Sequence, residues 1–265
     1  MDIAGKVFVV TGAGNGIARE LTLQLLAGGA SVAGIDLSEQ GLARTAELAG
    51  ETQSFSAHPL DITDRDAVAA LPDAVLAAHG RVDGLVNVAG IIQRFVKVAD
   101  LSFEDMEKVM AVNFWGVMHT CKAFLPHLVT RPEAALVNVS SMGAYAPVPG
   151  QAVYGASKAA VALLTEALAA ELRDTPVAVT VVYPGAIGTD IAANSGVAVG
   201  GSDADASGYK TTSPVEAARV IVGAIRKGAF RATIGADAAA MDKLSRLSPK
   251  FATELIAKRM GDLLG

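Results

Sequence analysis

Short apolar runs recur along the chain and are separated by longer stretches with helical periodicity. Most of the runs are nearly continuous in Val, Ile and Ala. A strand with one face in water would instead alternate apolar and polar residues. The runs therefore predict strands that are buried on both faces, at residues 7–10, 31–35, 54–57, 84–88, 134–139, 177–182 and 232–234.

The stretches between the runs have apolar residues three and four positions apart, which predicts amphipathic helices. These helices are expected at residues 17–27, 64–78, 103–128, 156–172 and 214–226. Two of them carry start signals, because Ser102 precedes Asp105 by three positions and Ser213 directly precedes Pro214. The alternating order predicts an α/β fold, a doubly wound parallel sheet of the Rossmann-like kind with helices on both faces, in one domain spanning residues 1–265. Ligands of such sheets bind beyond the carboxyl ends of the strands.

Two regions do not follow this alternation of strands and helices. Residues 189–212 are small, polar and rich in glycine, and a loop of that length inside a compact domain is usually functional or disordered. We interpret it as a substrate lid rather than a plain surface loop, because it follows a strand on the expected ligand side. Residues 236–265 are expected to be a C-terminal helical extension that serves packing or an oligomer contact.

The composition favours a packed domain that does not span a membrane. Of 265 residues, 51% are hydrophobic and 18% charged, with a mean hydropathy of +0.40, so the chain can bury enough apolar surface to fold. No window approaches the roughly 20 uninterrupted apolar residues of a spanning helix. The net charge of −5 provides no basic field for nucleic acid or anionic lipid. A small molecule is therefore the expected partner.

Cysteine and histidine usage argues against a disulfide and against a metal site. Cys121 is the single cysteine, and the chain runs from Met1 into the first predicted strand without a signal peptide, so we expect a cytoplasmic protein. His119 lies two positions from Cys121, but the local sequence offers no further ligands. No metal is expected.

A glycine-rich turn follows the first predicted strand, where residues 11–18 read TGAGNGIA. The spacing does not fit GxGxxG, but it fits TGxxxGxG with Ala18 at the last glycine position. Glycines let a backbone approach a pyrophosphate, whose charge is attracted by the N-terminus of the following helix. The turn indicates a dinucleotide site, although a tight turn without a ligand could have the same composition.

Asp36 ends the second predicted strand, about twenty residues beyond the glycines. A carboxylate at this point can accept hydrogen bonds from both adenosine ribose hydroxyls and would repel a 2′-phosphate. No Arg or Lys lies in the glycine turn or next to Asp36 in the sequence, so NAD(H) is favoured over NADP(H). The alternative is an aspartate that caps a helix and binds no ligand.

Tyr154 and Lys158 lie four positions apart, thirteen or more residues after the pair Ser140 and Ser141. This spacing places both side chains on one face of a helix, where the ammonium would favour the ionised phenol. Free tyrosine has a pKa of about 10, and a positive nicotinamide ring would help the lysine to lower it. A surface Tyr and Lys pair without function would have the same spacing.

Together these motifs resemble the short-chain dehydrogenase/reductase family, in its short single-domain branch, over residues 6–235. The residues that carry the resemblance are TGAGNGIA at 11–18, Asp61-Ile62, Asn87-Val88-Ala89-Gly90, Asn113, Ser141, Tyr154 with Lys158, and Pro184-Gly185 with Thr189. Ser141 is preferred to Ser140 because, in the resembling sequences, the tyrosine follows the serine by thirteen positions.

The resemblance implies a catalytic role for four residues. Tyr154 would be the general acid/base, and Ser141 would hydrogen-bond the substrate oxygen. Lys158 would lower the Tyr154 pKa and hold the nicotinamide ribose. Asn113 would carry a water molecule in the proton relay.

The resemblance also implies how NAD is bound. The glycine turn would bind the diphosphate, Asp36 the ribose, Asp61 and Ile62 the adenine, and the segment around Pro184 would close over the nicotinamide. The implied cofactor residues are Gly12, Gly14, Asn15, Gly16, Ile17, Asp36, Leu37, Asp61, Ile62, Asn87, Ala89, Gly90, Tyr154, Lys158, Pro184, Gly185, Ile187 and Thr189.

The substrate pocket should be walled by residues adjacent to the catalytic set. These are Gln93, Met142, Tyr145 and Ile191, together with Ile92, Arg94, Val148, Pro149 and Val153. Most are apolar, so we expect a secondary alcohol or its ketone on a largely apolar skeleton. Arg94 could pair with a substrate carboxylate, although a solvated surface arginine is the favoured interpretation.

The sequence therefore predicts an NAD-dependent oxidoreductase that interconverts a secondary alcohol and a ketone. Two alternatives stay open: an NADPH-dependent carbonyl or 3-ketoacyl reductase, and a non-catalytic NAD-binding regulatory subunit. The resemblance further implies a homodimer or homotetramer, often formed through the helices that hold Asn113 and Tyr154.

Overall fold

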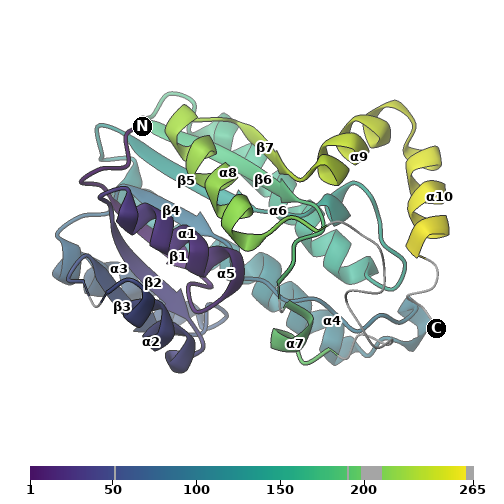
Figure 1. The fold of residues 1–265 in the computed structure, drawn as a ribbon, viewed down its shortest axis with the longest axis horizontal. Helices are drawn as coiled ribbons and strands as arrows, with labels where there is room; N and C mark the ends of the chain where they lie inside the picture. The colour runs from purple at the N-terminus through teal and green to yellow at the C-terminus, as the bar shows by residue number, and fades with distance from the viewer. Residues whose placement is uncertain (51, 190, 198–210, 261–265) are drawn as a thin grey trace.

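A seven-stranded parallel sheet forms the centre of the molecule (Figure 1), as seen in a computed structural model that describes residues 1–50, 52–189, 191–197 and 211–260. The strands are β1 Val7–Thr11, β2 Ser31–Asp36, β3 Phe55–Pro59, β4 Gly84–Asn87, β5 Ala134–Val139, β6 Val177–Pro184 and β7 Arg231–Ile234. Their order in the sheet is β3-β2-β1-β4-β5-β6-β7. The predicted α/β fold with a doubly wound parallel sheet is confirmed.

Helices cover both faces of this sheet. They are α1 Gly16–Ala27, α2 Glu39–Leu48, α3 Arg65–His79, α4 Phe103–Met110, α5 Gly116–Leu128, α6 Ala152–Glu171, α7 Ile191–Asn194, α8 Pro214–Lys227, α9 Ala236–Leu247 and α10 Pro249–Met260. One apolar core lies between the sheet and α1, α2 and α8, and a second lies between the opposite face and α3, α5 and α6. The two cores explain why β1, β4 and β5 are buried along their whole length.

The strand order changes direction at the centre of the sheet, and this point positions the candidate site. The chain builds outward from β1 through β2 to β3 and then returns to the other side of β1 with β4. The loops that leave β1 and β4 therefore diverge to opposite faces and open a crevice between them. Gly84 at the start of β4 lets the two strands pack closely, because a Cβ atom at Gly84 would lie 2.3 Å from the Phe8 ring.

Two predicted helices differ from the observed ones. The single helix expected at residues 103–128 is interrupted by a π-helical turn, η2 Ala111–Trp115, between α4 and α5. Such a turn accommodates an extra residue, here at buried Asn113, whose amide bonds the backbone of Ile91. The helix expected at residues 156–172 begins earlier, at Ala152, so Tyr154 lies in its first turn. Most of the strand predictions were displaced by one or two residues at an end.

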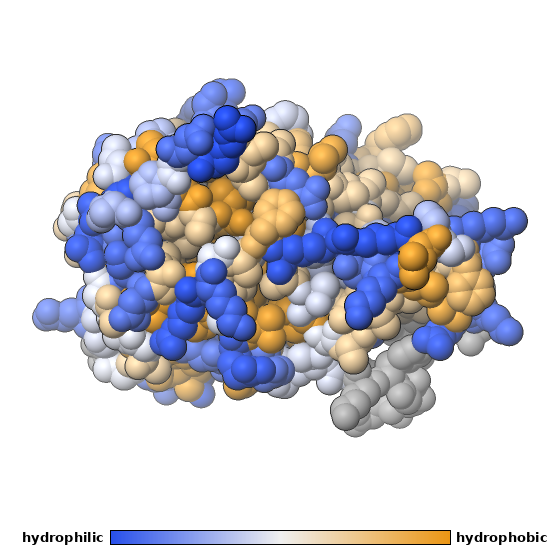
Figure 2. All heavy atoms as spheres, turned by 90° about the horizontal axis from the view of Figure 1, so that it is seen from above, coloured by the Kyte–Doolittle hydropathy of each residue, from blue (hydrophilic) through white to orange (hydrophobic). Residues whose placement is uncertain are grey.

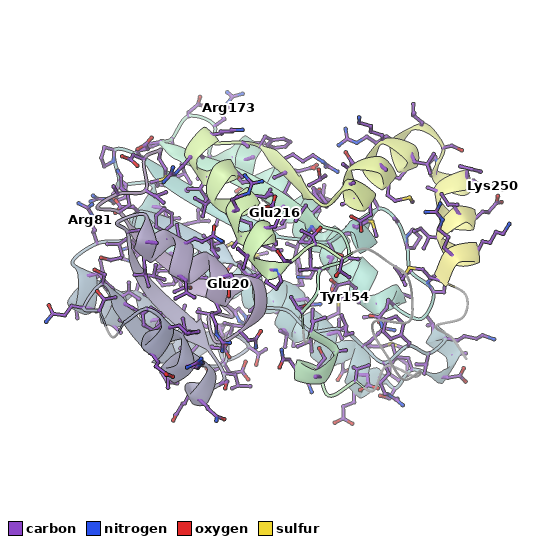
Figure 3. All side chains as sticks on the ribbon, viewed as in Figure 1. Glu20, Arg81, Tyr154, Arg173, Glu216 and Lys250 are labelled. Atoms are coloured by element: carbon purple, nitrogen blue, oxygen red, sulfur yellow. The ribbon has the colours of Figure 1, made fainter. Side chains whose placement is uncertain are left out.

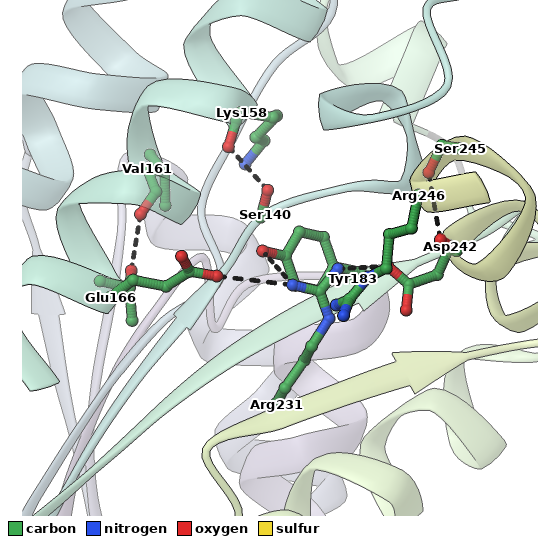
Figure 4. Close-up of polar contacts among 10 residues, drawn as sticks. Ser140, Lys158, Val161, Glu166, Tyr183, Arg231, Asp242, Ser245 and Arg246 are labelled. Carbon is green, nitrogen blue, oxygen red and sulfur yellow. Dashed lines mark hydrogen bonds and ion pairs between the residues drawn. The ribbon is translucent and has the colours of Figure 1, made fainter. Parts of the chain in front are cut away.

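The C-terminal region packs against the loop that follows β5. Helices α9 and α10 form a small apolar cluster with residues of that loop, separate from the two main cores (Figure 1). On the other side of α9, Asp242 pairs with Arg231 of β7, and Arg231 also pairs with Glu166 of α6 (Figure 4). The Arg231 guanidinium lies 4.0 Å from the centre of the Tyr183 ring. These contacts connect α9 to the helix that carries Tyr154.

Helix α6 is the one described helix that is long and apolar enough to cross a membrane by length and composition. Core helices of globular proteins pass the same test, and α6 packs along β5 and β6 through buried Val161 and Leu168. Figure 2 shows hydrophilic and apolar side chains interspersed over the face seen from above.

Two histidines converge on one serine at the sheet edge and make stability pH-dependent. The Ser56 Oγ atom on β3 lies 2.8 Å from His58 Nε2 and 2.7 Å from His79 Nε2 at the end of α3. Burial lowers the pKa of both histidines, and the neighbouring His79 lowers that of His58 further. The unfolded chain therefore binds these protons more readily than the folded chain does.

We expect the free energy of unfolding to fall as the pH drops through 6.5, the ordinary histidine pKa, towards the lowered values of the folded state. Urea unfolding at a series of pH values measures this decrease. The double substitution His58→Gln and His79→Gln should flatten the profile in this window, whereas His127→Gln on α5 should leave it unchanged. An identical profile in the double variant would contradict the assignment.

Candidate active site

A cavity of about 440 Å³ opens at the carboxyl ends of β1, β2 and β4, where the strand order changes direction. It brings together predicted cofactor residues that are far apart in the sequence. Those that line it are Gly12, Asn15, Gly16, Ile17, Asp36, Leu37, Asp61, Ile62, Ala89, Gly90 and Thr189. The cavity thus runs from the glycine turn past the ends of β2 and β3 to the loop after β4.

The glycine turn and Asp36 fit against each other. Gly12 and Gly16 have positive φ values of 78° and 52°, which side chains disfavour. The Gly14 N–H donates to Asp36 Oδ2 over 2.8 Å, and a Cβ atom on Gly14 would lie 2.7 Å from the Asp36 carboxyl carbon. The other carboxylate oxygen accepts the Ser38 N–H. Ser38 itself caps α2, so Asp36 is not the capping residue.

Arg19 lies against this turn, and sequence reasoning missed it. From the first turns of α1, its guanidinium donates to the Gly14 carbonyl and its Nε donates to Thr45 Oγ1 over 3.1 Å. The sequence has no Arg or Lys inside the turn or next to Asp36, and it is the fold of α1 that brings the Arg19 guanidinium against the turn. The spacing of five residues after Gly14 was the available signal, because a helix starting at Gly16 brings that side chain back over its own N-terminus.

Asn87 supports the cofactor flank from behind and does not line it. Its side chain is buried, donates to Asn138 Oδ1 over 2.8 Å and accepts the Thr120 hydroxyl over 2.7 Å. Asn138 donates onward to Thr165 of α6. This chain of bonds ties β4 and β5 to the helices that cover them, and the cavity wall itself is formed by the next residues, 88–91. The predicted cofactor contact at Asn87 stays a prediction, and in the structure its side chain supports the cofactor flank from behind.

Tyr154 and Ser141 meet near the middle of the molecule (Figure 3). The Ser141 side chain lies close enough to the Tyr154 phenol to lower its pKa, and its Oγ accepts the Gly143 N–H over 3.0 Å. Gly143 lies beside the ring, since a Cβ atom there would be in ordinary van der Waals contact with Tyr154 at 3.5 Å. Burial raises the pKa of Tyr154, and Ser141 partly offsets that rise.

Lys158 and Asn113 converge at Gly90, in the loop after β4. A Cβ atom on Gly90 would lie 3.0 Å from Lys158 Nζ and 3.2 Å from Asn113 Oδ1. Lys158 Nζ is buried and donates to the Val139 carbonyl over 3.1 Å. Burial lowers the pKa of Lys158 to about 8. The lysine is further fixed through its backbone, whose carbonyl accepts the Ser140 hydroxyl over 2.7 Å (Figure 4).

The Asn113 amide holds three elements together. Its Oδ1 accepts the Ile91 N–H over 2.9 Å, and its Nδ2 donates to the Ile91 carbonyl and to Ser157 Oγ. Ser157 in turn donates to the Tyr154 carbonyl. The π-helical turn is thus bonded both to the cofactor flank and to α6. The predicted water-carrying role of Asn113 remains a prediction.

The segment after β6 is held by a residue that the sequence did not single out. The Gly185 N–H donates to the Ile234 carbonyl, and the Ala186 N–H donates to Asp237 Oδ2 over 2.8 Å. A Cβ atom on Gly185 would lie 2.3 Å from the Asp237 carboxylate. Asp237 lies 51 residues away from Ala186, so only the tertiary fold reveals the contact. Beyond this point the segment turns so that Thr189 contacts Gly16.

The lid expected at residues 189–212 is described only in part, because 190 and 198–210 lie outside the described residues. Its first part is helix α7, and Ile191 and Ser195 line the cavity. The Ser195 hydroxyl accepts the Ile92 N–H over 3.0 Å, which joins this part of the loop to the cofactor flank. Ile187 pairs with Thr212 at the far end of the loop.

Several residues expected to wall the substrate pocket have other partners. Gln93 is 2% exposed and bonds the backbone at the start of α6. Arg94 forms an ion pair with Asp105 over 2.9 Å, which agrees with the surface interpretation. The Tyr145 hydroxyl donates to the Ala238 carbonyl of α9. Met142 packs on the apolar cluster of α9 and α10. The loop after Ser141 therefore faces the C-terminal helices.

Comparison with known proteins agrees with this geometry. A family model for short chain dehydrogenases matches residues 6–198. The chain is 40% identical over 261 residues to the oxidoreductase SadH of Mycobacterium tuberculosis, covering 96% of this chain and 94% of that protein. It is 35% identical over 190 residues to the 3-oxoacyl-acyl-carrier-protein reductase FabG of Thermotoga maritima, covering 71% of this chain and 77% of FabG.

Among solved structures, the chain is similar to a short chain dehydrogenase/reductase from Burkholderia phymatum in complex with NAD. The TM-score is 0.83 at 27% identity, and the match covers 93% of this chain and 94% of that one.

Proposed function

Because the chain belongs to the short-chain dehydrogenase family, we propose that it is an NAD-dependent oxidoreductase that interconverts a secondary alcohol and a ketone on a largely apolar small molecule. The observation that carries the proposal is that buried Tyr154, which interacts with Ser141, lies one turn of α6 before buried Lys158, whose Nζ lies against Gly90 in the wall of a nucleotide-sized cavity. A regulatory subunit without activity would not need these groups together.

The residues of the cavity fit a dinucleotide. The glycine turn offers backbone N–H groups at the start of α1 for the diphosphate, and the Asp36 carboxylate stands at the end of β2 for the ribose. Gly90 keeps open the space in front of Lys158, since a side chain there would meet the ammonium group. When bound, NAD supplies the acceptor for the hydride that leaves the alcohol carbon.

Residues of the chain itself would take up and return the proton of the alcohol. Ser141 would orient the alcohol oxygen towards Tyr154, whose phenolate form would take the hydroxyl proton during oxidation. Lys158 would stabilise that phenolate, which burial alone disfavours. In reduction, the phenol would return the proton to the carbonyl oxygen. The Ser141 and Tyr154 hydroxyls would also stabilise negative charge that develops on this oxygen.

The test is a screen of secondary alcohols with NAD⁺ at alkaline pH, followed by the absorbance of NADH. Turnover of apolar secondary alcohols, and weak turnover of primary alcohols and sugars, is the expected result. Absence of NAD(P)-linked turnover with any alcohol or ketone would contradict the proposal. Expected further properties are a cytoplasmic location and a homo-oligomer.

Large apolar side chains on α4 to α6 support the expected oligomer. Phe103, Trp115 and Leu163 are 79%, 52% and 70% exposed in the isolated chain. They lie on the helices that adjoin Asn113 or carry Tyr154, where a partner subunit would bury them.

An NADPH-dependent carbonyl or 3-ketoacyl reductase is the second candidate, and Arg19 is the observation that favours it. Its guanidinium adjoins the glycine turn, and FabG is a 3-oxoacyl-acyl-carrier-protein reductase. Two facts weigh against it: the Asp36 carboxylate lines the cavity, and Arg19 is already bonded to Gly14 and Thr45. We therefore place NAD first.

Substitution of Asp36 separates the two candidates. Asp36→Asn keeps the shape but removes the charge that would repel a 2′-phosphate, so the ratio of kcat/KM for NADP⁺ to that for NAD⁺ should rise by roughly 10²-fold. Adding Arg19→Met should reverse most of that gain, and Glu39→Gln on α2 controls for net charge. A wild-type preference for NADP⁺ would instead support the second candidate.

A further inference from the structure

Both polar atoms of the Gln93 side-chain amide form hydrogen bonds with the protein. The side chain is 2% exposed. Its Oε1 atom accepts the Val153 N–H and the Tyr154 N–H, both over 2.9 Å, and its Nε2 donates to the Gly150 carbonyl over 3.0 Å. The Gln93 backbone carbonyl accepts the Gln151 side-chain amide over 2.7 Å. Four bonds therefore join the loop after β4 to the start of α6.

These bonds replace the usual cap of a helix. The first N–H groups of a helix have no partner within it, and a Ser, Thr, Asp or Asn at the N-cap normally accepts one of them. The N-cap of α6 is Gln151, whose side chain makes no such bond. Gln93 performs that function from 60 residues away in the sequence.

The location of the cap is important because α6 carries Tyr154. Tyr154 is the third residue of α6, and one of the two capped N–H groups is its own. Gln93 also lies two positions after residues 88–91, which form the cofactor flank of the cavity. A single side chain thus connects the wall next to the cofactor with the backbone of the residue proposed to transfer the proton.

We propose that Gln93 is a positioning residue that sets the place of Tyr154 relative to the cofactor, and that an uncharged acceptor is required there. The inference rests on the proposed function, because it assigns Tyr154 the proton transfer. Gln93 does not touch the phenol, and its partners at Gly150, Gln151, Val153 and Tyr154 are uncharged groups.

The requirement for an amide follows from electrostatics. A carboxylate at the same position would also accept the two N–H groups, and its charge would be favoured by the helix dipole. That charge would stand close to Tyr154 and oppose formation of the phenolate, whose pKa is already raised by burial. Lys158 is the cation on the same helix, and Ser141 interacts with the phenol from the loop after β5. A glutamate at position 93 would counteract the stabilisation of the phenolate by both Lys158 and Ser141.

Gln93→Glu is the variant that distinguishes positioning from plain structural support. The full chain is labelled with tyrosine carrying ¹³C at Cζ, saturated with NADH and titrated with pH by NMR, and the Tyr154 signal is identified by its loss in Tyr154→Phe. We expect the Tyr154 titration midpoint to rise by about one pH unit in Gln93→Glu. Gln24→Glu makes the same chemical change on α1, where the amide bonds the Val215 carbonyl, and should leave the midpoint unchanged.

Gln93→Met provides a second, uncharged test. It fills similar volume but leaves two N–H groups of α6 without their acceptor, so kcat should fall by roughly tenfold while the Kd for NADH changes less than twofold. Gln93→Glu should recover part of the lost kcat at a pH above its new midpoint, because it restores the cap.

An unchanged Tyr154 midpoint in Gln93→Glu together with wild-type kcat in Gln93→Met would overturn the inference, even if both variants are less stable. The NMR titration needs no substrate. A shifted midpoint in a chain that oxidises no alcohol would therefore refute the proposed function and leave the positioning by Gln93 standing.

Discussion

Replacing Tyr154 by phenylalanine should lower kcat by about 10³-fold or more while leaving the Kd for NADH nearly unchanged. The substitution removes one hydroxyl group, the proposed proton donor and acceptor, and keeps the ring in its place beside Gly143. Ser141 retains its bond from the Gly143 N–H, so the surrounding loop keeps one of its anchors. Initial rates from NADH absorbance and NADH fluorescence titrations measure the two quantities.

Tyr183→Phe is the matched control. Tyr183 is a buried tyrosine of β6 whose hydroxyl accepts from Arg231 and has no place in the proposed chemistry. Its turnover should stay within about threefold of the wild type, since it loses one hydrogen bond that contributes roughly 1 kcal/mol to stability. Activity of Tyr154→Phe close to that of Tyr183→Phe would refute the assignment of the general acid/base.

Lys158→Met should lower kcat by roughly 10²-fold near pH 8 and regain activity as the pH rises towards 10. Methionine fills the same buried space but cannot stabilise the phenolate, so more alkaline solution is needed to ionise Tyr154. The measurement is the pH dependence of kcat and of kcat/KM. Lys122→Met on the exposed surface of α5 should retain the wild-type profile. A Lys158→Met profile that is lower but not displaced would show that the lysine acts only through cofactor binding.

The same substitution should increase stability when no cofactor is bound. Burial lowers the pKa of Lys158 from 10.5 to about 8, so the unfolded chain binds this proton more tightly than the folded chain. Below pH 8 the lowered pKa of Lys158 reduces the free energy of unfolding of the wild type by its full amount, about 3 kcal/mol. The advantage of Lys158→Met in urea unfolding should therefore be largest at neutral pH and vanish as the pH rises from 8 to 10.5. Lower stability of Lys158→Met at pH 7 would contradict this account.

The sequence was sufficient for the alternation of strands and helices along the chain and for the approximate place of the site. Runs such as 134–139 are buried on both faces in the structure, as their continuous apolar character predicted. The residues at the carboxyl ends of β1, β2 and β4 meet because parallel strands present those ends at one edge. Eleven predicted cofactor residues consequently line one cavity.

What the sequence missed depends on long-range contacts or on competition between polar groups. Asn87 and Gln93 were expected to face ligands, but each side chain is taken up by partners inside the protein. An amide at the end of a strand has the same pattern whether it points into a cleft or into the core. Asp237 bonds the backbone of Ala186 from 51 residues away, which local periodicity cannot reveal, whereas the Arg19 contact with Gly14 was within reach of helical spacing. The π-helical turn at Asn113 was missed for the same reason as the Asp237 contact, because the Asn113 amide bonds the backbone of Ile91 in the loop after β4.

The apolar cluster of α9 and α10 is separate from the two main cores, so its residues can change in evolution independently of them. Substitutions among Met241, Ala252 and Ile256 would reshape the backing of the loop after Ser141 without disturbing either main core. Selection can therefore vary the backing of this loop while the sheet, the cavity at the strand ends and the Tyr154 helix stay constant. Because we propose that this loop adjoins the substrate, grafting the C-terminal segment of one relative onto the core of another is expected to exchange substrate preference.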